Sequence, residues 1–399
     1  MGKNVVYLEK LSKYKDSFSV KVITGIRGVG KTKLLMEFAE TLKNDGVPPE
    51  KIIFINFDEF EQIADFQQLY EFVNEKIMYL DQAYLLFDEI DRVQGWEKAI
   101  NAFFVGAPVD IYITSSNFGV LSKDFLALLS KNYELIYMQP LPFNEYVNLF
   151  STDEDFDMAE VFQQYLNYGG LPIAAQCSRS TNIVKILLSG IYHTALNKDV
   201  IARYGVRDAA LIHSMNKFLA LNIGKPVNHK VIDDYLSSVN HSTTGYTMDN
   251  YLNLIDESGI FRRVERYDLR ARTTINGSER FYCADTGICN VLAGDDNLTI
   301  DSLLENIVCI ELWRRGYEVF VGKIGEMKVS FVGIKNSNYV YYQVVSHIEN
   351  KSQLRKILNP LERIRDQYSK FILSMDNPVP SDYNGIKNCN IFDFLVGNV

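Results

Sequence analysis

Residues 23–35 read ITGIRGVGKTKLL, and this stretch decides the fold of the first part of the chain. Two apolar residues close a short strand-like run, a glycine-rich bend follows, and a helical pattern begins at the lysine. The bend fits the pattern GxxxxGK[ST], in which glycines let successive N–H groups point toward phosphate oxygens at a helix N-terminus. We therefore expect a strand, a phosphate-binding loop and a helix, in this order.

The loop suggests a nucleotide as its ligand. The Lys31 side chain can reach the β- and γ-phosphates, and the hydroxyl of Thr32 can ligate Mg²⁺. The expected nucleotide-binding residues are Gly25, Ile26, Arg27, Gly28, Val29, Gly30, Lys31, Thr32 and Lys33. ATP with Mg²⁺ is the expected ligand.

A second motif, YLLFDEI at residues 84–90, consists of four apolar residues followed by two acids. A buried strand that ends in Asp88 would deliver a carboxylate to the magnesium, so Thr32 and Asp88 are the expected metal-binding residues. Glu89 would orient and deprotonate the attacking water. We therefore predict Glu89 and Lys31 as catalytic residues.

A third strand-like run, VDIYITSSN at residues 109–117, ends in four polar residues. A polar side chain at its end would lie between the strand of Asp88 and the phosphate loop, where it could contact the γ-phosphate. Asn117 or Ser116 is the candidate for this sensor, and Asn117 is counted here with the catalytic residues. A simple cap of the strand is the alternative.

Length and composition bound the rest of the molecule. The 399 residues are too many for one ordinary core and suggest two to four domains, and 47% hydrophobic with 23% charged residues is typical of globular proteins. The formal charge of -9 argues weakly against a protein coated in nucleic acid. Neither a CxxC pair nor an HExxH spacing occurs, and no signal or membrane span is evident, so we expect a cytoplasmic protein without zinc or disulfides.

The pattern of elements changes along the chain and divides it into four parts. Over 1–150, short apolar runs alternate with helical stretches, which indicates a mostly parallel sheet covered on both faces. Helical periods dominate 151–206. Several short helices and then the strand-like FRRVERYDL fill 207–275, an order typical of a winged helix-turn-helix, and an α/β pattern restarts over 276–399.

With these motifs, the chain resembles prokaryotic AAA+-type ATP-binding proteins that carry a C-terminal domain of unknown function with a restriction-endonuclease-like, PD-(D/E)xK fold. The resemblance runs over nearly the whole chain, through GIRGVGKT, LLFDEIDRVQGWEKAI, MQPLPFNEY, NYGGLP, NKDVIARYGVRD, RYDLRARTT, YCADTGI and LLENIVCIELWRRGYEVFVGK. It implies an α/β multi-domain protein with a P-loop ATPase core, a helical lid, a winged helix and a nuclease-like domain. It implies no known biological role.

The chain departs from this family in the first part. Such proteins usually show Ser-Gly-Arg-Tyr before the PLPF motif, with the arginine as a charge-stabilising finger, whereas this chain has Ser-Lys-Asn-Tyr at 130–133. Asn132 thus replaces a guanidinium that is worth roughly 10³–10⁵ in rate in related enzymes, and Lys131 lacks its planar fork. We expect ATP binding with slow turnover, unless a protein partner or a second copy of the chain supplies an arginine.

A second departure removes the metal ligands that the resemblance implies for the nuclease-like domain. The family's Glu-Ile-Asp-Phe-Val is Lys-Val-Ser-Phe-Val at 328–332, so Ser330 replaces the metal-holding aspartate, and Gln343 stands where the next strand has a glutamate. An active nuclease is therefore disfavoured. A displaced metal site built from Glu305 and Glu326 is the alternative.

Five arginines after the last short helix of 207–275 could contact DNA phosphates along one face of a β-ribbon. They are Arg262, Arg263, Arg266, Arg270 and Arg272. Glu265 and Asp268 share the stretch, so a salt-bridged ribbon is an equal alternative, and winged helices also dock proteins.

The predicted function is a slow or partner-activated Mg-dependent ATPase that acts as a nucleotide-driven switch. The alternative is an ATP-gated DNA- or protein-binding regulator with negligible hydrolysis, such as one in defence against foreign DNA.

Overall fold

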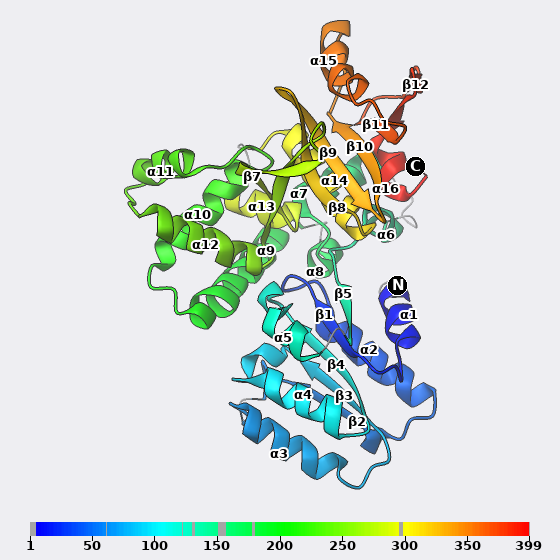
Figure 1. Cartoon of the computed structure of the whole chain (residues 1–399), viewed down its shortest axis with the longest axis vertical. Coiled ribbons are helices and arrows are strands. Elements are labelled where there is room, and N and C mark those ends of the chain that lie inside the picture. The colour runs from blue at the N-terminus through cyan, green and yellow to red at the C-terminus, as the bar shows by residue number, and fades with distance from the viewer. Residues whose placement is uncertain are drawn as a thin grey trace. The chain divides into compact units, whose positions relative to one another are not determined.

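The computed structural model describes residues 5–60, 62–121, 123–129, 132–150, 157–177, 180–294 and 298–398. The chain divides into two compact units. The first contains Met1–Met138 and Glu257–Gly259, and the second contains Gln139–Asp256 and Ile260–Val399. Each unit has its own β-sheet (Figure 1).

The first unit is built on a five-stranded sheet in the order β2-β3-β4-β1-β5, with all neighbouring strands parallel. Its strands are β1 (Val20–Thr24), β2 (Ile52–Asn56), β3 (Ala83–Asp88), β4 (Val109–Ser115) and β5 (Tyr133–Tyr137). Every residue of β1 and β3 is buried, which explains why both strands occur as unbroken apolar runs. The predicted parallel sheet is confirmed, and β5 is an additional strand that the sequence analysis did not predict.

Helices cover both faces of this sheet, with α1 and α2 on one side and α3, α4 and α5 on the other (Figure 1). Their bounds are α1 (Val5–Lys13), α2 (Lys31–Asn44), α3 (Phe66–Ile77), α4 (Trp96–Gly106) and α5 (Lys123–Leu128), with short 3₁₀ turns at Pro49–Lys51, Ile90–Arg92 and Phe118–Leu121. The main core lies on the side of α3 and α4, where Leu69, Phe103 and Phe125 pack against the strands. This core lies directly beneath the sheet whose carboxyl edge carries the loops described below.

The second unit begins with helices. They are α6 (Phe143–Asn148), α7 (Met158–Tyr168), α8 (Pro172–Gln176), α9 (Thr181–Thr194), a π-helical continuation at Ala195–Ala202, α10 (Ala209–Leu221), α11 (His229–Ser238) and α12 (Gly245–Glu257), and later α13 (Thr286–Ala293), α14 (Ile300–Arg314), α15 (Lys351–Glu362) and α16 (Ile391–Val396). Between α10 and α11, Val227 forms an isolated antiparallel bridge with Glu279.

The sheet of the second unit has eight strands in the order β12-β13-β11-β10-β9-β8-β6-β7. They are β6 (Phe261–Asp268), β7 (Thr273–Cys283), β8 (Glu318–Ile324), β9 (Met327–Lys335), β10 (Asn338–Val344), β11 (Ser369–Ser374), β12 (Asp382–Tyr383) and β13 (Ile386–Asn390). The β6–β7 hairpin joins this sheet through parallel pairing of β6 with β8. The boundary expected after residue 275 therefore falls inside β7, because the hairpin expected as a separate wing continues the C-terminal sheet.

Two motifs that are 115 residues apart in the sequence meet within the second unit. Asp285 caps α13 by accepting from the N–H groups of Gly287 and Ile288, and its other oxygen accepts from the N–H of Gly170 at 2.8 Å. Gly169 has φ 73°, and a Cβ there would lie 2.1 Å from the Asp285 carboxylate. The glycines of NYGGLP thus let the backbone reach the buried aspartate of YCADTGI, and burial raises the pKa of Asp285 to about 6.

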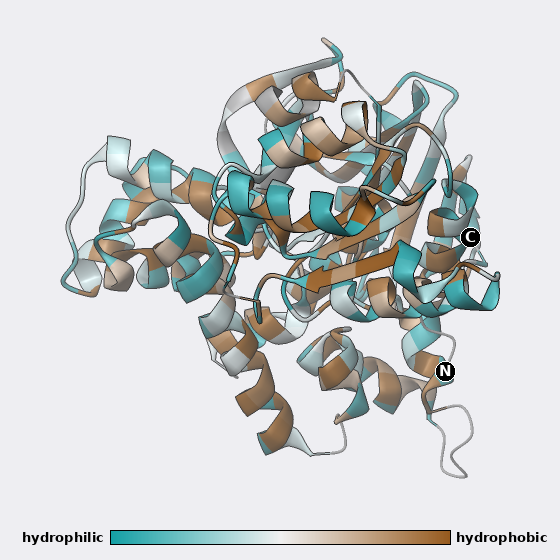
Figure 2. Ribbon diagram, turned by 90° about the horizontal axis from the view of Figure 1, so that it is seen from below, coloured by the Kyte–Doolittle hydropathy of each residue, from teal (hydrophilic) through white to brown (hydrophobic). Residues whose placement is uncertain are grey.

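Hydrophobic residues gather on the strands and on the helix sides that cover them (Figure 2). Within the residues that the structure describes, none of the helices is both long and apolar enough to cross a lipid bilayer.

Candidate nucleotide-binding site

The phosphate-binding loop joins β1 to α2 at the carboxyl edge of the first sheet. Gly28 has φ 85° and Gly30 has φ 107°, a left-handed conformation that other residues rarely adopt. A Cβ at Gly25 would lie 2.4 Å from the carbonyl oxygen of Met138, whereas a Cβ at Gly30 would have no neighbour within 4 Å. Gly25 is therefore required by close packing and Gly30 by backbone conformation, and the space in front of Gly30 is open.

Lys31 lies inside the loop and is 4% exposed. Its Nζ donates to the carbonyl oxygen of Gly25 at 2.9 Å and to Oγ of Ser116 at 2.8 Å. The Nζ also lies 3.5 Å from Oε1 of Glu89. The cation expected to bind phosphate thus lies beside the acid expected to orient water.

Asp88 ends β3 and is fully buried. It accepts from the hydroxyl of Thr32 at 2.7 Å and from the hydroxyl of Thr114 at 2.6 Å. Burial raises the pKa of Asp88, and the two hydroxyls oppose this effect. A hydroxyl and a carboxylate on adjacent elements are oxygen ligands of the kind that Mg²⁺ prefers, so Thr32 and Asp88 fit the expected metal.

Glu89 adopts a left-handed backbone conformation with φ 51° and ψ 47°. Its N–H donates to Oγ1 of Thr114 at 2.9 Å. Its carboxylate accepts from the hydroxyl of Ser116 at 2.6 Å and from the N–H of Ser116 at 3.1 Å. Such backbone strain costs about 1–3 kcal/mol in a non-glycine residue, and it persists only where the surrounding contacts hold it. Here Thr114, within β4, holds the backbone of Glu89. Ser116, just after β4, holds its side chain.

Asp58 and Arg92 are two further charged residues beside this site that the sequence motifs do not single out. Asp58 follows β2 and pairs with Arg27 and with Arg92, at 2.9 Å in each case. Burial alone would raise the pKa of Glu89, but Lys31, the Ser116 hydroxyl and the two arginines outweigh burial and hold that pKa below its usual range. The signal for Arg92 was present in the sequence, since it follows the acidic pair within the same motif.

The two sensor candidates have different surroundings. Ser116 contacts both Lys31 and Glu89. The Asn117 side chain instead accepts from the N–H of Gly119 within the following turn, although Asn117 is also fully buried. Ser116 is therefore the member of the pair that links the phosphate-binding lysine to the acid.

Asn132 lies at the opposite edge of the sheet from the phosphate loop. Its carbonyl oxygen accepts from the N–H of Val20, the first residue of β1, at 3.0 Å. The loop follows the other end of β1, about 13 Å away at 3.3 Å per strand residue. The residue at this position is therefore remote from the phosphate loop of its own chain. Ser130 and Lys131 lie outside the described residues.

The polar residues of the second sheet form a closed network where the nuclease-like site was considered. Oε1 of Glu305 accepts from Lys328 at 2.6 Å and from the hydroxyl of Ser330 at 3.1 Å. The side chain of Gln343 accepts from the N–H of Ser330 at 3.1 Å and donates to the carbonyl of Lys328 at 3.1 Å. Lys328 thus provides the positive charge beside Glu305.

The alternative metal site from Glu305 and Glu326 is not formed. Glu326 is 97% exposed in the β8–β9 turn and pairs with Lys323, whereas Glu305 pairs with Lys328. Across the described residues, no group of three histidine, cysteine, aspartate or glutamate side chains is arranged to hold a metal.

The five arginines of the predicted ribbon do not share one face. Arg262 stacks 4.0 Å above the ring of Trp313, and Arg263 pairs with Glu279 at 3.2 Å. A register shift after Val264 interrupts the strand alternation on which the shared face depended. Arg270 and Arg272 lie beyond the end of β6 and are exposed.

Comparison with known proteins supports the fold of the first unit. Residues 17–147 match the family described as AAA domain, and residues 159–299 match a domain of unknown function (DUF8612). An uncharacterized protein of Haemophilus influenzae is 32% identical over 395 residues, which cover 98% of this chain and 97% of that protein.

Two solved structures show how far the likeness extends. The Walker-type ATPase PABY2304 of Pyrococcus abyssi has a TM-score of 0.53 and 16% identity, covering 73% of this chain and 96% of that chain. The Orc1 protein of Aeropyrum pernix, solved in complex with DNA, has a TM-score of 0.36 and 13% identity, covering 74% and 93%, which is too distant to bear on function. This chain belongs to the family of the Haemophilus influenzae protein, and its first unit has a P-loop NTPase fold that matches the AAA domain over residues 17–147.

Proposed function

We propose that the chain binds ATP with Mg²⁺ and is a slow or partner-activated ATPase that acts as a nucleotide-driven switch. The observation that carries this proposal is the contact of Lys31 with both Ser116 and Glu89, directly behind the glycine loop. This arrangement joins a phosphate-binding cation, a polar strand end and an acid in one buried cluster.

The loop from Gly25 to Lys33 would hold the nucleotide, with Lys31 drawn toward its terminal phosphates. Thr32 and Asp88 would hold the magnesium, which supplies charge neutralisation at the phosphates. Glu89 would orient a water molecule and accept its proton. Ser116 would report the presence of the γ-phosphate, and Asn117 would fix the turn from which Ser116 projects.

The contacts of Glu89 support the proposed slow turnover. Lys31 and Ser116 engage its carboxylate oxygens, so Glu89 must exchange these partners before it can accept a proton from water. The position of Asn132 provides no arginine to a neighbouring site. An arginine from another protein or another part of an assembly would then set the rate.

A second candidate function is an ATP-gated DNA- or protein-binding regulator. The order α10, the bridge at Val227, α11, α12 and the β6–β7 hairpin is compatible with a winged helix-turn-helix whose hairpin also joins the C-terminal sheet. The order α14, β8–β10, α15 and β11 is compatible with a nuclease-like scaffold, and its closed polar network favours a role in binding or packing instead of cleavage.

The first experiment measures ATP affinity by titration calorimetry with and without Mg²⁺, in the wild type and in Thr32→Val. Thr41→Val is the matched control, because Thr41 lies on the same helix but donates to the carbonyl oxygen of Glu37. We expect Mg²⁺ to strengthen ATP binding in the wild type and in the control, and to do so far less in Thr32→Val. ATP binding that is absent, or equally dependent on Mg²⁺ in all three proteins, would refute the assigned site.

Phosphate release, measured with and without duplex DNA, then separates the two functions. Hydrolysis that Mg²⁺ supports and that DNA or a partner accelerates favours the ATPase switch. Tight ATP binding without hydrolysis under any of these conditions favours the binding regulator.

A further inference from the structure

A pocket of about 690 Å³ lies in the second unit between the turn after β6 and the segment that follows α15. Its charged lining consists of Arg270, Arg272, Arg363 and Arg365 with two acids, Glu362 and Asp366. The four arginines outnumber the two acids, so the lining has a net positive formal charge. The pocket unites two arginines from the predicted ribbon with two that lie about ninety residues later, a combination that proximity in sequence does not reveal.

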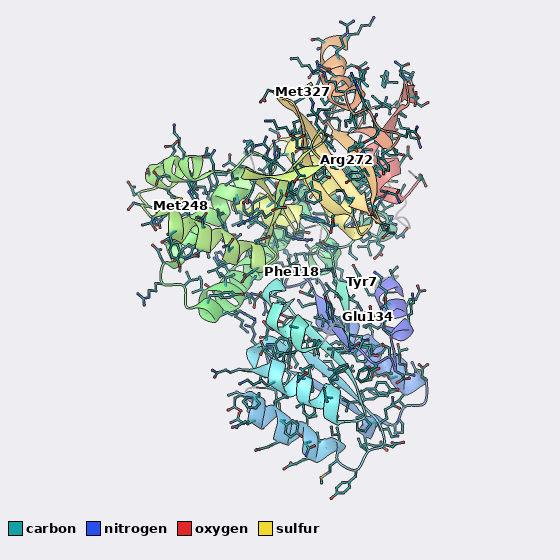
Figure 3. The ribbon with its side chains drawn as sticks, viewed as in Figure 1. Tyr7, Phe118, Glu134, Met248, Arg272 and Met327 are labelled. Atoms are coloured by element: carbon teal, nitrogen blue, oxygen red, sulfur yellow. The ribbon has the colours of Figure 1, made fainter. Side chains whose placement is uncertain are left out.

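The turn after β6 holds its two arginines in a defined arrangement. The carboxylate of Asp268 accepts from the N–H groups of Arg270 at 2.8 Å and Ala271 at 3.0 Å, and its carbonyl accepts from the N–H of Arg272 at 2.8 Å. The bonds from Ala271 and Arg270 hold the pKa of Asp268 below its usual range. Arg272, labelled in Figure 3, has φ 55° in this turn, and its guanidinium group lies 5.4 Å from the ring centre of Tyr339.

The opposite side of the pocket is anchored by apolar residues. Leu361 is fully buried and Ile364 is 5% exposed, whereas Arg363 and Arg365 on either side of Ile364 are exposed. The buried side chains fix the backbone, so both guanidinium groups are presented to solvent from a rigid segment. Exposed cations continue along α15, at Lys351, Arg355 and Lys356.

The two acids of the pocket offset half of the formal charge of the four arginines and leave a net positive charge. Asp366 lies 3.7 Å from Arg272 and also accepts from the hydroxyl of Tyr341 at 2.6 Å. In the described part of the chain, this is the only carboxylate pairing among the four arginines, and Arg363 otherwise donates to the amide oxygen of Asn359 at 3.1 Å. Three guanidinium groups therefore keep their capacity to bind an anion.

We infer that this pocket binds the phosphates of a nucleic-acid backbone, with duplex DNA as the test ligand. The planar guanidinium group of arginine matches two phosphate oxygens. Sites for small ligands are mostly apolar and concave. Several exposed guanidinium groups with few apolar neighbours therefore suit a polyanion better than a small ligand. The inference rests on the second proposed function and gives it a location. It does not depend on ATP hydrolysis.

The test measures binding of the full chain to a labelled 30-base-pair duplex by fluorescence anisotropy over a series of salt concentrations. The variants are Arg270→Ala/Arg272→Ala and Arg363→Ala/Arg365→Ala, and Lys10→Ala/Lys13→Ala on α1 is the control with the same loss of charge. Inorganic pyrophosphate is titrated separately by calorimetry. Circular dichroism verifies that every variant is folded.

Each pocket variant should weaken duplex binding by about tenfold or more at low salt and reduce the slope of log K against log salt by about 2, because each lost phosphate contact accounts for about 0.9. The control should bind as the wild type does. Duplex binding that the pocket variants leave unchanged would overturn the pocket but retain a DNA-binding function. Pyrophosphate binding as tight as duplex binding would replace the backbone site by a small-anion site, and no binding of either probe would refute both the pocket and the DNA function.

Discussion

A lysine, a glutamate and a serine meet in both units of this protein, but the two sets differ in what surrounds them. Lys31, Glu89 and Ser116 lie at the end of a parallel sheet beside glycines with left-handed conformations. Lys328 and Ser330 lie within β9 and contact Glu305 of α14.

The first set has an open approach for a ligand, because a Cβ at Gly30 would have no neighbour within 4 Å. In the second set, the amide of Gln343 satisfies both the N–H of Ser330 and the carbonyl of Lys328. Similar side chains therefore stand beside an open loop in one unit, where we propose a ligand site, and within a closed network in the other, and the backbone around them makes the difference.

The largest expected effect is the loss of hydrolysis in Glu89→Gln, with Glu305→Gln as the matched change in the second unit. Removal of a residue that orients and deprotonates water should lower kcat by about 10²–10⁴ while ATP binding remains. Glu305→Gln should change kcat by less than about twofold, since the two units hold independent networks. Steady-state phosphate release checks both, and equal losses in the two variants would contradict the distinction.

Replacement of each lysine by alanine is expected to produce the next largest difference in ATP turnover between the two units. Lys31→Ala should lower kcat/KM for ATP by about 10²–10³, the range for loss of one preorganised charge-stabilising group. Lys328→Ala should leave this parameter near the wild-type value. If ATP turnover depended on Lys328, the network of the second unit would have to be reconsidered as part of a functional site.

A moderate effect on stability should appear only in the second network. Lys328→Ala removes the alkyl chain and the Nζ donor of Glu305, which a neutral lysine would keep, and we expect a cost of about 1–3 kcal/mol in the free energy of unfolding, reduced from the buried limit because Lys328 is partly exposed. Fluorescence can follow this unit alone in a Trp96→Phe background, since Trp313 is the other tryptophan. The conservative variant Lys328→Arg should regain much of the loss; an unchanged urea midpoint in Lys328→Ala would contradict the supporting role.

The smallest expected effect concerns pH. Burial lowers the pKa of Lys328 from its ordinary value of 10.5, and the nearby Glu305 only partly opposes this effect. At pH values just below 10.5, the unfolded chain therefore binds more protons than the folded chain. Stability should therefore rise with pH in this window, by less than about 1 kcal/mol after allowance for solvent screening. Urea unfolding at pH 8 to 10, compared with Lys328→Met, measures the difference. If stability instead falls as the pH rises, and this fall disappears in Lys328→Met, the pKa of Lys328 is raised in the folded chain and the prediction is wrong.

Sequence reasoning located those features that depend on neighbours in the chain. The loop, Asp88 and Glu89 were identifiable because their spacing and their apolar strands are local signals. The choice between Ser116 and Asn117 was not, because the turn that follows β4 decides which side chain contacts Lys31.

Features that depend on distant parts of the chain were predicted poorly. β5 pairs with β1 across more than one hundred residues, and its register places Asn132 far from the phosphate loop. The arginines near β6 were expected on one face, but a register shift and the partners Trp313 and Glu279 divide them. Arg363 and Arg365 approach Arg270 only through the tertiary fold.

The contact between Asp285 and Gly170 has a consequence for synthesis of the protein. The two residues are 115 positions apart, so at typical rates of translation roughly 6 to 23 s pass between their additions to the chain. During this interval the NYGGLP turn has left the peptidyl-transferase centre without the carboxylate that fixes it. The turn between α7 and α8 therefore gains its last fixed contact only after most of the second unit has been synthesised.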